Sequence, residues 1–131
     1  MKILVGYDGS EPARRALDVA KEHARAFKAE KVYVVACLEG FPQDQVKHMA
    51  ETEKLLAEAK AALEKEGLPV ETQMLTKSLS AGEGLVDFAK ENKVNEVIIG
   101  VVRTSKVGKL IFGSTAQFVI LNAPCPVQTV K

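Results

Sequence analysis

The sequence has no long apolar run, no excess of charge of one sign and few cysteines. No stretch approaches the roughly 20 apolar residues that cross a bilayer, so a membrane-spanning protein is not expected. Eighteen basic residues stand against seventeen acidic ones, which gives a net charge of +1 without any concentrated basic run. That balance argues against duplex nucleic acid or an anionic membrane as the main partner. Met1 leads directly into strand-like sequence without an apolar signal region, so we expect a cytoplasmic protein.

The two cysteines and two histidines do not form a metal-binding pattern. Cys37 and Cys125 each lie in an apolar segment, and neither stands at ligand spacing from His23 or His48. We therefore expect reduced core thiols rather than a metal site, a redox pair or a disulfide. No repeat, linker or low-complexity tract divides the chain, so residues 1–131 are predicted to form one domain.

Strand and helix signals alternate along the chain. The strand-like apolar runs are Ile3–Val5, Val32–Leu38, Val70–Leu75, Val97–Ile99 and Val127–Val130. Helical patterns follow Ser10 and Ser80 and cover about Asp44–Glu66 and Ser114–Leu121. We expect the apolar stripes of these helices, including Phe27 and Val46, to face the sheet. Five strands alternating with four helices predict a doubly wound α/β fold, a parallel sheet with helices on both faces.

The segment around Gly113 predicts an anion site. Ser114, with Gln117 three residues later, has the form of a capping box, so Ser114 is expected to cap a helix. The free amides of the first turn and the positive end of the helix dipole then gather just after Gly113, where a phosphate can bind. The alternatives are that Ser114 acts as a cap alone and that Gly113 serves packing alone.

The spacing of the glycines points to a family. Gly100, two residues, Arg103, nine residues and then Gly113-Ser114 resembles the signature of the universal stress proteins, which is glycine, two residues, glycine, nine residues, glycine and Ser/Thr. The resemblance extends to residues 2–10 and 122–127 and so covers almost the whole chain. It implies binding of ATP or a related adenine nucleotide such as AMP or ADP, a sheet of strand order 3-2-1-4-5, and a homodimer formed through the last strand, Val127 to Val130.

That strand order predicts where the ligand binds. Ligands of such sheets lie beyond the carboxyl ends of the strands where the order reverses, which brings Asp8, Gly100 and Ser114 to one cleft. The Asp8 carboxylate then accepts hydrogen bonds from ribose hydroxyls or helps to hold Mg²⁺ near the phosphates, although Asp8 and Gly9 also suit a simple tight turn. The resemblance places the adenine near Cys37, held by backbone groups. The predicted nucleotide-binding residues are Gly6, Asp8, Cys37, Gly100, Arg103, Gly113, Ser114 and Thr115.

Arg103 stands where the family signature has a glycine. If that position needs a left-handed conformation or a close approach of phosphate, a side chain costs roughly 1–2 kcal/mol or blocks the phosphate. Alternatively, the guanidinium binds the phosphates itself, helped by Lys106 and Lys109. A third interpretation is an arginine that faces solvent.

Catalysis has little support in the sequence. No phosphate-binding Gly-x-x-x-x-Gly-Lys-Ser/Thr motif is present, and both histidines fall within predicted helices, away from the crevice. Asp8 is the one evident general base, so we expect slow ATP hydrolysis at most and assign no catalytic residue and no metal ligand. The sequence therefore predicts a nucleotide-binding sensor or regulator of the stress response. The alternative is a nucleotide-free homodimeric interaction module in which Arg103 has closed the site.

Overall fold

A five-stranded parallel sheet forms the centre of the protein. The computed structural model describes residues 1–38, 42–76, 80–102 and 113–131. The strands are β1 (Lys2–Gly6), β2 (Lys31–Cys37), β3 (Val70–Leu75), β4 (Glu96–Gly100) and β5 (Val127–Val130). Their order is β3-β2-β1-β4-β5 with every neighbouring pair parallel, which confirms the predicted fold class and strand order.

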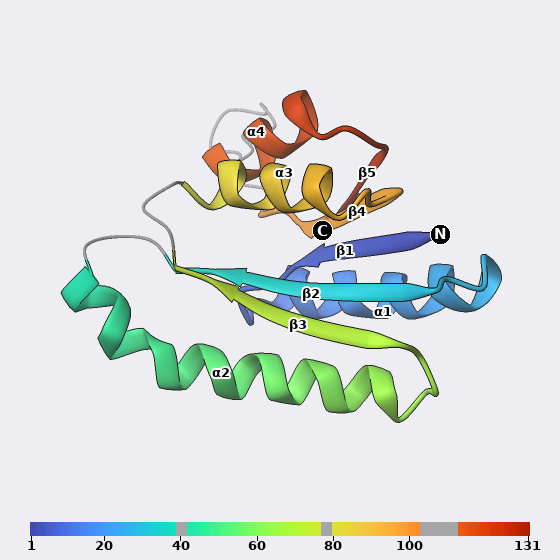
Figure 1. Cartoon of the computed structure of the whole chain (residues 1–131), viewed down its shortest axis with the longest axis horizontal. Coiled ribbons are helices and arrows are strands. Elements are labelled where there is room, and N and C mark those ends of the chain that lie inside the picture. Colours follow the sequence, from blue (N-terminus) through green and yellow to red (C-terminus); the bar gives the residue numbers. More distant parts are fainter. Residues whose placement is uncertain (39–41, 77–79, 103–112) are drawn as a thin grey trace.

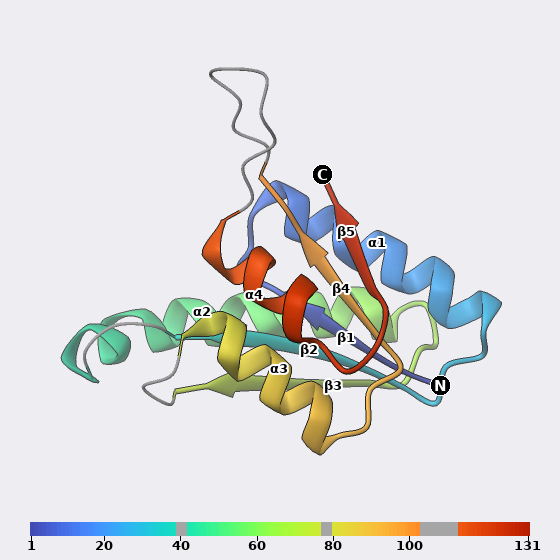
Figure 2. The same ribbon diagram turned by 90° about the horizontal axis from the view of Figure 1, so that it is seen from above.

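Helices cover both faces of this sheet. They are α1 (Glu11–Ala26), α2 (Pro42–Glu64), α3 (Ala81–Glu91) and α4 (Ser114–Asn122). Figure 1 shows α1 and α2 on one face and α3 and α4 on the other. Seen from above, α3 and α4 lie in front of the sheet and α1 and α2 behind it (Figure 2). Each helix joins two parallel strands, as right-handed crossovers require.

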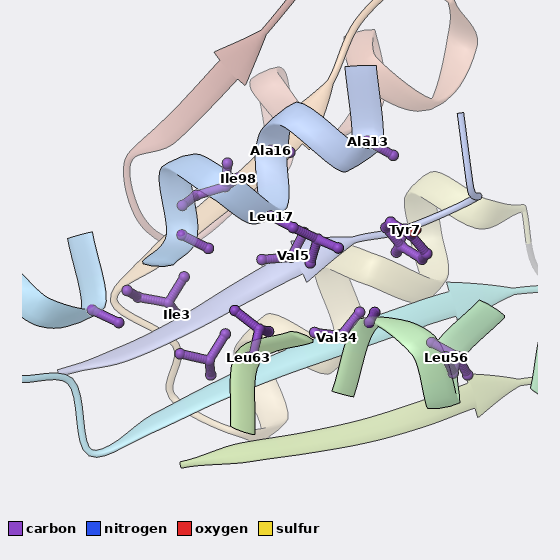
Figure 3. Close-up of a cluster of buried hydrophobic side chains, with 14 of the residues drawn as sticks. Ile3, Val5, Tyr7, Ala13, Ala16, Leu17, Val34, Leu56, Leu63 and Ile98 are labelled. Atoms are coloured by element: carbon purple, nitrogen blue, oxygen red, sulfur yellow. The ribbon is translucent and has the colours of Figure 1, made fainter. Parts of the chain in front are cut away.

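The central strands are buried because their side chains alternate between two cores. Ile3 and Val5 of β1 point toward α1 and α2, whereas Leu4 points toward α3 and α4. Figure 3 shows the first of these cores, where Leu17 of α1 and Leu63 of α2 pack against β1 and β2. A strand with apolar residues on both faces needs a helical layer on each side, which this fold supplies. The partly exposed pattern of β3 confirms its predicted place at an edge.

Two helices begin where the sequence predicts. The side chain of Ser10 accepts a hydrogen bond from the amide of Ala13 at 3.3 Å, and Ser80 accepts one from the amide of Glu83 at the same distance. Both serines therefore cap their helices, α1 and α3, and satisfy an amide that has no partner inside the helix. In both cases the helix starts beside the carboxyl end of the preceding strand.

Two predicted core residues are exposed instead. The Phe27 side chain is 57% exposed because α1 ends at Ala26 and Phe27 is its C-cap. Val46 is 68% exposed, although Leu56 and Leu63 of the same predicted stripe are buried. The first turns of α2, to which Val46 belongs, reach past the carboxyl ends of β2 and β3 (Figure 1). The same overhang brings α2 to the candidate site.

Candidate functional site

A cavity of about 440 Å³ lies at the carboxyl ends of β1, β2 and β4. Its size falls within the range of roughly 300–1,000 Å³ that is common for small-molecule sites. The chain leaves β1 toward β2 on one side and reaches β4 on the other, so the cavity lies at the point where the strand order reverses. The position is the one predicted from the strand order.

The cavity brings together most of the residues that the sequence singled out. Those that line it are Gly6, Asp8, Cys37, Gly100, Gly113 and Thr115. Ser114 lies between two lining residues, but its exposed side chain is not part of the wall. Arg103, together with Lys106 and Lys109, lies outside the described residues. The fold thus brings the segments around Asp8, Gly100 and Gly113, which are distant in the sequence, to one cavity.

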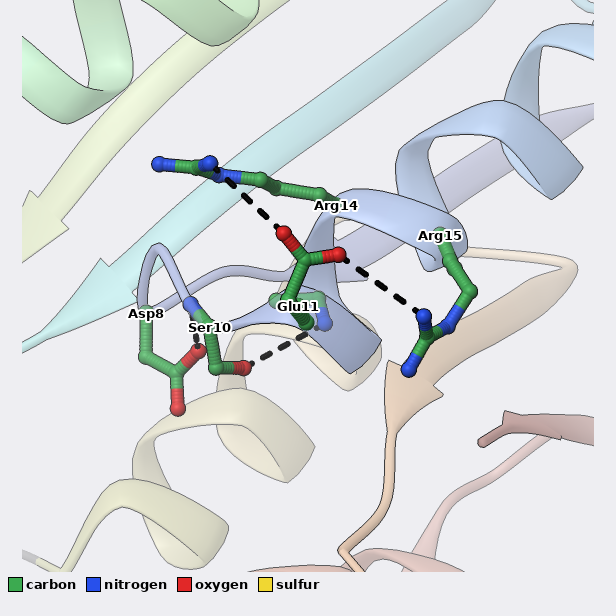
Figure 4. A network of polar contacts seen from close by, with 6 residues as sticks. Asp8, Ser10, Glu11, Arg14 and Arg15 are labelled. Atoms are coloured by element: carbon green, nitrogen blue, oxygen red, sulfur yellow. Dashed lines mark hydrogen bonds and ion pairs between the residues drawn. The ribbon is translucent and has the colours of Figure 1, made fainter.

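Asp8 forms the turn that the local sequence predicts and also faces the cavity. Its Oδ1 accepts a hydrogen bond from the Ser10 amide at 2.9 Å, as Figure 4 shows. Gly9 has a φ of +79°, the left-handed region that favours glycine. No residue that the structure describes donates to the second oxygen of Asp8, which leaves that oxygen able to accept hydrogen bonds from a ligand. The turn and the ligand contact are therefore compatible.

Gly100 is required by packing. A Cβ at this position would lie 2.5 Å from the backbone nitrogen of Ala13 and 2.5 Å from the carbonyl carbon of Pro12. The first turn of α1 occupies the space that a side chain at this position would need. Backbone atoms cannot move aside as a flexible side chain can, so glycine is needed here whether or not a ligand binds.

The beginning of α4 differs from the sequence prediction by one residue. Gly113, not Ser114, is the N-cap, with φ −63° and ψ 161° and no side chain that could accept a hydrogen bond. The capping-box interpretation of Ser114 is therefore wrong, because Gln117 donates its amide to the carbonyl of Gly113 and thereby makes Ser114 the first helical residue. The free amides nevertheless lie just after Gly113, as predicted.

The α4 terminus offers unpaired donors to the cavity. Among the described residues, none accepts a hydrogen bond from the amides of Ser114, Thr115 or Ala116. A Cβ added to Gly113 would meet no described atom within 4 Å, so no described side chain crowds the start of α4 at this point. Unpaired amides and the positive end of the dipole favour an anion at this point.

The electrostatic character of the cavity depends on helix ends more than on side chains. Ala13 of α1, Ala81 of α3 and Thr115 of α4 all contribute to its wall, so three helix N-termini meet there. Serines cap the first two, whereas α4 has no such cap. Asp8 is the one charged side chain in the wall as far as the structure describes it. The arrangement suits a ligand that carries phosphate at one end.

Sequence reasoning missed the contribution of α2. Thr52 and Leu55 line the cavity from this helix, none of whose residues was among the predicted nucleotide-binding residues. They lie three residues apart and so share one face of the helix. Leu55 packs on the turn at Gly9, with Cδ1 2.9 Å from the position of a Cβ there. No local signal reveals that this turn of α2 reaches the crevice, because it depends on the overhang of the helix.

The cysteines and histidines have no evident chemistry in the site. Cys37 lies at the end of β2, and its thiol donates a hydrogen bond to the carbonyl of Ala81 with a separation of 3.7 Å. Cys125 is also a free thiol, and burial, together with the nearby Glu96 carboxylate, raises its pKa. The Nδ1 atom of His23 lies 2.7 Å from Oε1 of Glu96, at the amino end of β4 and so away from the cavity.

None of the helices that the structure describes is both long and apolar enough to cross a membrane.

Comparisons with known proteins identify the family to which the sequence is similar. The sequence profile of the universal stress protein family matches residues 1–131. A universal stress protein of Thermus aquaticus is 36% identical over an alignment of 138 residues. The match covers 98% of this chain and 97% of that protein.

Solved structures of universal stress proteins have the same fold. One from Archaeoglobus fulgidus is 36% identical, superposes with a TM-score of 0.87, and covers 100% of this chain and 93% of that chain. Another structure from the same organism, a universal stress protein in complex with dAMP, is 32% identical with a TM-score of 0.83, and the match covers 100% of this chain and 98% of that one.

Proposed function

We propose that this chain, which belongs to the universal stress protein family, binds ATP or a related adenine nucleotide in the cavity and acts as a nucleotide sensor or regulator. The observation that carries the proposal is the N-terminus of α4 at the edge of the cavity, which has no side-chain cap and whose first amides have no partner among the described residues. The dAMP complex of the Archaeoglobus fulgidus relative supports a nucleotide of this class. A single nucleotide-binding domain over residues 1–131 and a cytoplasmic location are the other parts of the proposal.

In this proposal the phosphates bind at α4. The amides of Thr115 and Ala116 donate to phosphate oxygens, and the Thr115 hydroxyl adds a further donor. Gly113 places no side chain of its own over these amides, and Gly6 lines the cavity at the end of β1, where a Cβ would lie 3.0 Å from Cδ1 of Leu85. None of these contacts involves the base of the nucleotide.

Asp8 supports the middle of the nucleotide. Its second carboxylate oxygen suits a ribose hydroxyl, which is a hydrogen-bond donor. A carboxylate of this kind also fits Mg²⁺, which proteins commonly bind through one or two carboxylates and the phosphates of the ligand. When bound, the metal neutralises part of the phosphate charge. Without it, Asp8 favours a ligand whose phosphates lie away from the carboxylate, toward α4.

Calorimetric titration with ATP and with AMP, each with and without Mg²⁺, tests the proposal. We expect saturable binding of adenine nucleotides with one site per chain. The absence of any heat at millimolar nucleotide, with displacement of a fluorescent ATP analogue also absent, would instead favour a nucleotide-free interaction module. The same titration of Arg103→Gly reports on the departure from the family signature, since tighter binding means that the arginine obstructs and weaker binding means that it contacts phosphate.

A homodimer through β5 is the last part of the proposal. β5 pairs with β4 on one side and forms the edge of the sheet on the other. The carbonyls of Pro126 and Val130 accept hydrogen bonds from amides of β4 and of the residue directly after it. The alternation of the backbone therefore turns the amides of Val127 and Thr129 toward the open edge. Unpaired edge amides favour addition of another strand.

Thr129→Pro should convert the dimer to a monomer. Proline removes an outward-facing amide and leaves the hydrogen bonds between β4 and β5 untouched. Thr129→Val keeps the amide and serves as the control. Sedimentation velocity should give the mass of two chains for the wild type and for Thr129→Val, and that of one chain for Thr129→Pro. A wild type that sediments as one chain at micromolar concentration contradicts this part of the proposal.

A further inference from the structure

Helix α2 forms one wall of the cavity. Thr52 and Leu55 face the space in which the nucleotide is proposed to bind, and the part of α2 that carries them lies toward the carboxyl ends of β2 and β3 (Figure 1). Leu55 packs against the turn at Gly9, next to Asp8. Because Leu55 fixes the helix against this turn, the Thr52 side chain has a defined place relative to the carboxylate of Asp8.

The two ends of the cavity differ in chemistry. At the α4 end are free amides and the hydroxyl of Thr115. At the β2 end the wall consists mainly of apolar groups, with Ala36 from β2 and Leu85 from α3. β2 and β4 are separated by one strand, which corresponds to roughly 10 Å across the sheet. A nucleotide whose phosphates are at α4 therefore places its base at the β2 end, between α2 and α3.

Thr52 supplies the polar side chain of α2 at the base end. No described residue forms a hydrogen bond with its hydroxyl, which is half-buried and lines the cavity. Cys37, another polar side chain at this end, already donates to the carbonyl of Ala81. A hydroxyl both donates and accepts, so it suits the ring nitrogens and the exocyclic amino group of adenine.

We infer that Thr52 contacts the base of the bound nucleotide and is a specificity-determining residue of the site, with Leu55 as the apolar surface beside it. The inference rests on the proposed function, because it concerns the base of the nucleotide assigned there. The inference gives α2 a role in binding, although none of the predicted nucleotide-binding residues lies in this helix.

Thr52→Val tests the inference, because valine has nearly the shape of threonine without the hydroxyl. We expect its affinity for ATP to fall roughly three- to tenfold, the effect of one lost hydrogen bond. Tripolyphosphate has no base for Thr52 to contact, so its affinity should stay within about twofold, which corresponds to about 0.4 kcal/mol. Thr52→Ser retains the hydroxyl and should bind ATP like the wild type. Thr72→Val, which removes a half-buried hydroxyl from β3 outside the cavity, is the matched control.

The outcomes separate the inference from the proposed function. If the wild type binds neither ATP nor tripolyphosphate, the proposed function fails and the inference fails with it. If the wild type binds both equally well, or if Thr52→Val binds ATP like the wild type, the inference is overturned and the anion site at α4 stands. An equal loss of both ligands in Thr52→Val also overturns it, because the hydroxyl would then act on the phosphates or on the fold. Circular dichroism of each variant reports whether α2 stays helical.

Discussion

Gly113→Asp should lose at least about tenfold in ATP affinity while its melting temperature stays unchanged or rises. Aspartate is a good N-cap, and its charge is favourable at the positive end of the helix, so α4 gains stability. A Cβ meets no described atom within 4 Å at this position, and the φ of −63° suits any residue. The fold should therefore accept the substitution.

The loss of affinity has an electrostatic cause. The new carboxylate would occupy the place proposed for the phosphates, and two unit charges at about 4 Å repel by roughly 1 kcal/mol in water and about 4 kcal/mol near a protein surface. Calorimetry with ATP and thermal unfolding of the same samples measure the two effects. A variant that gains stability and loses binding cannot be explained by misfolding.

Gly113→Asn is the matched control for charge. Asparagine caps the helix almost as well and has nearly the same shape, but it is neutral. Both variants occupy an amide of the first turn, so both should bind ATP less tightly than the wild type, and Gly113→Asp should bind it least. Equal affinities of the aspartate and asparagine variants would contradict a phosphate at this position.

Gly100→Ala should destabilise the protein by about 3 kcal/mol or more, at the upper end of the cost of overpacking. The added Cβ would lie 2.5 Å from backbone atoms of Pro12 and Ala13, so either β4 or the first turn of α1 must move. Urea unfolding measures the effect as a lower midpoint at an unchanged slope. Because α1 also holds the turn of Asp8, we expect weaker nucleotide binding in the same variant.

Gly113→Ala is the control for this prediction. It adds the same methyl group to another glycine of the cavity wall, where it would meet no described atom within 4 Å. Its cost should be no more than about 1 kcal/mol, the difference between glycine and alanine as an N-cap. If Gly100→Ala and Gly113→Ala unfold at the same urea concentration, the backbone of α1 does not restrict the side chain at position 100.

The two glycines show what the sequence could and could not predict. Spacing alone treated Gly100 and Gly113 as parts of one family signature. In the structure Gly100 is constrained by the backbone of α1, whereas a Cβ at Gly113 would meet no described atom within 4 Å. A motif identifies positions where side chains are absent, but the reason for each absence depends on which distant segment lies beside it.

The strands and helices followed from local patterns because those patterns are strong, whereas the strand order came from the family resemblance. Buried runs such as Val97 to Ile99 and serine caps such as Ser10 indicate strand and helix within a few residues. The exposed Val46 and the cavity-lining Thr52 could not be predicted, because both depend on how far α2 extends past the sheet. The helical period predicts which face a residue occupies but not what lies opposite that face.

A crystal structure of the complex with AMP tests the account most directly. We predict phosphate oxygens about 2.7–3.2 Å from amide nitrogens at the start of α4, among Ser114 to Ala116, and the adenine between α2 and α3 at the end of β2. AMP bound outside the cavity, or bound in the reverse direction with its phosphate beside Cys37, would contradict the account.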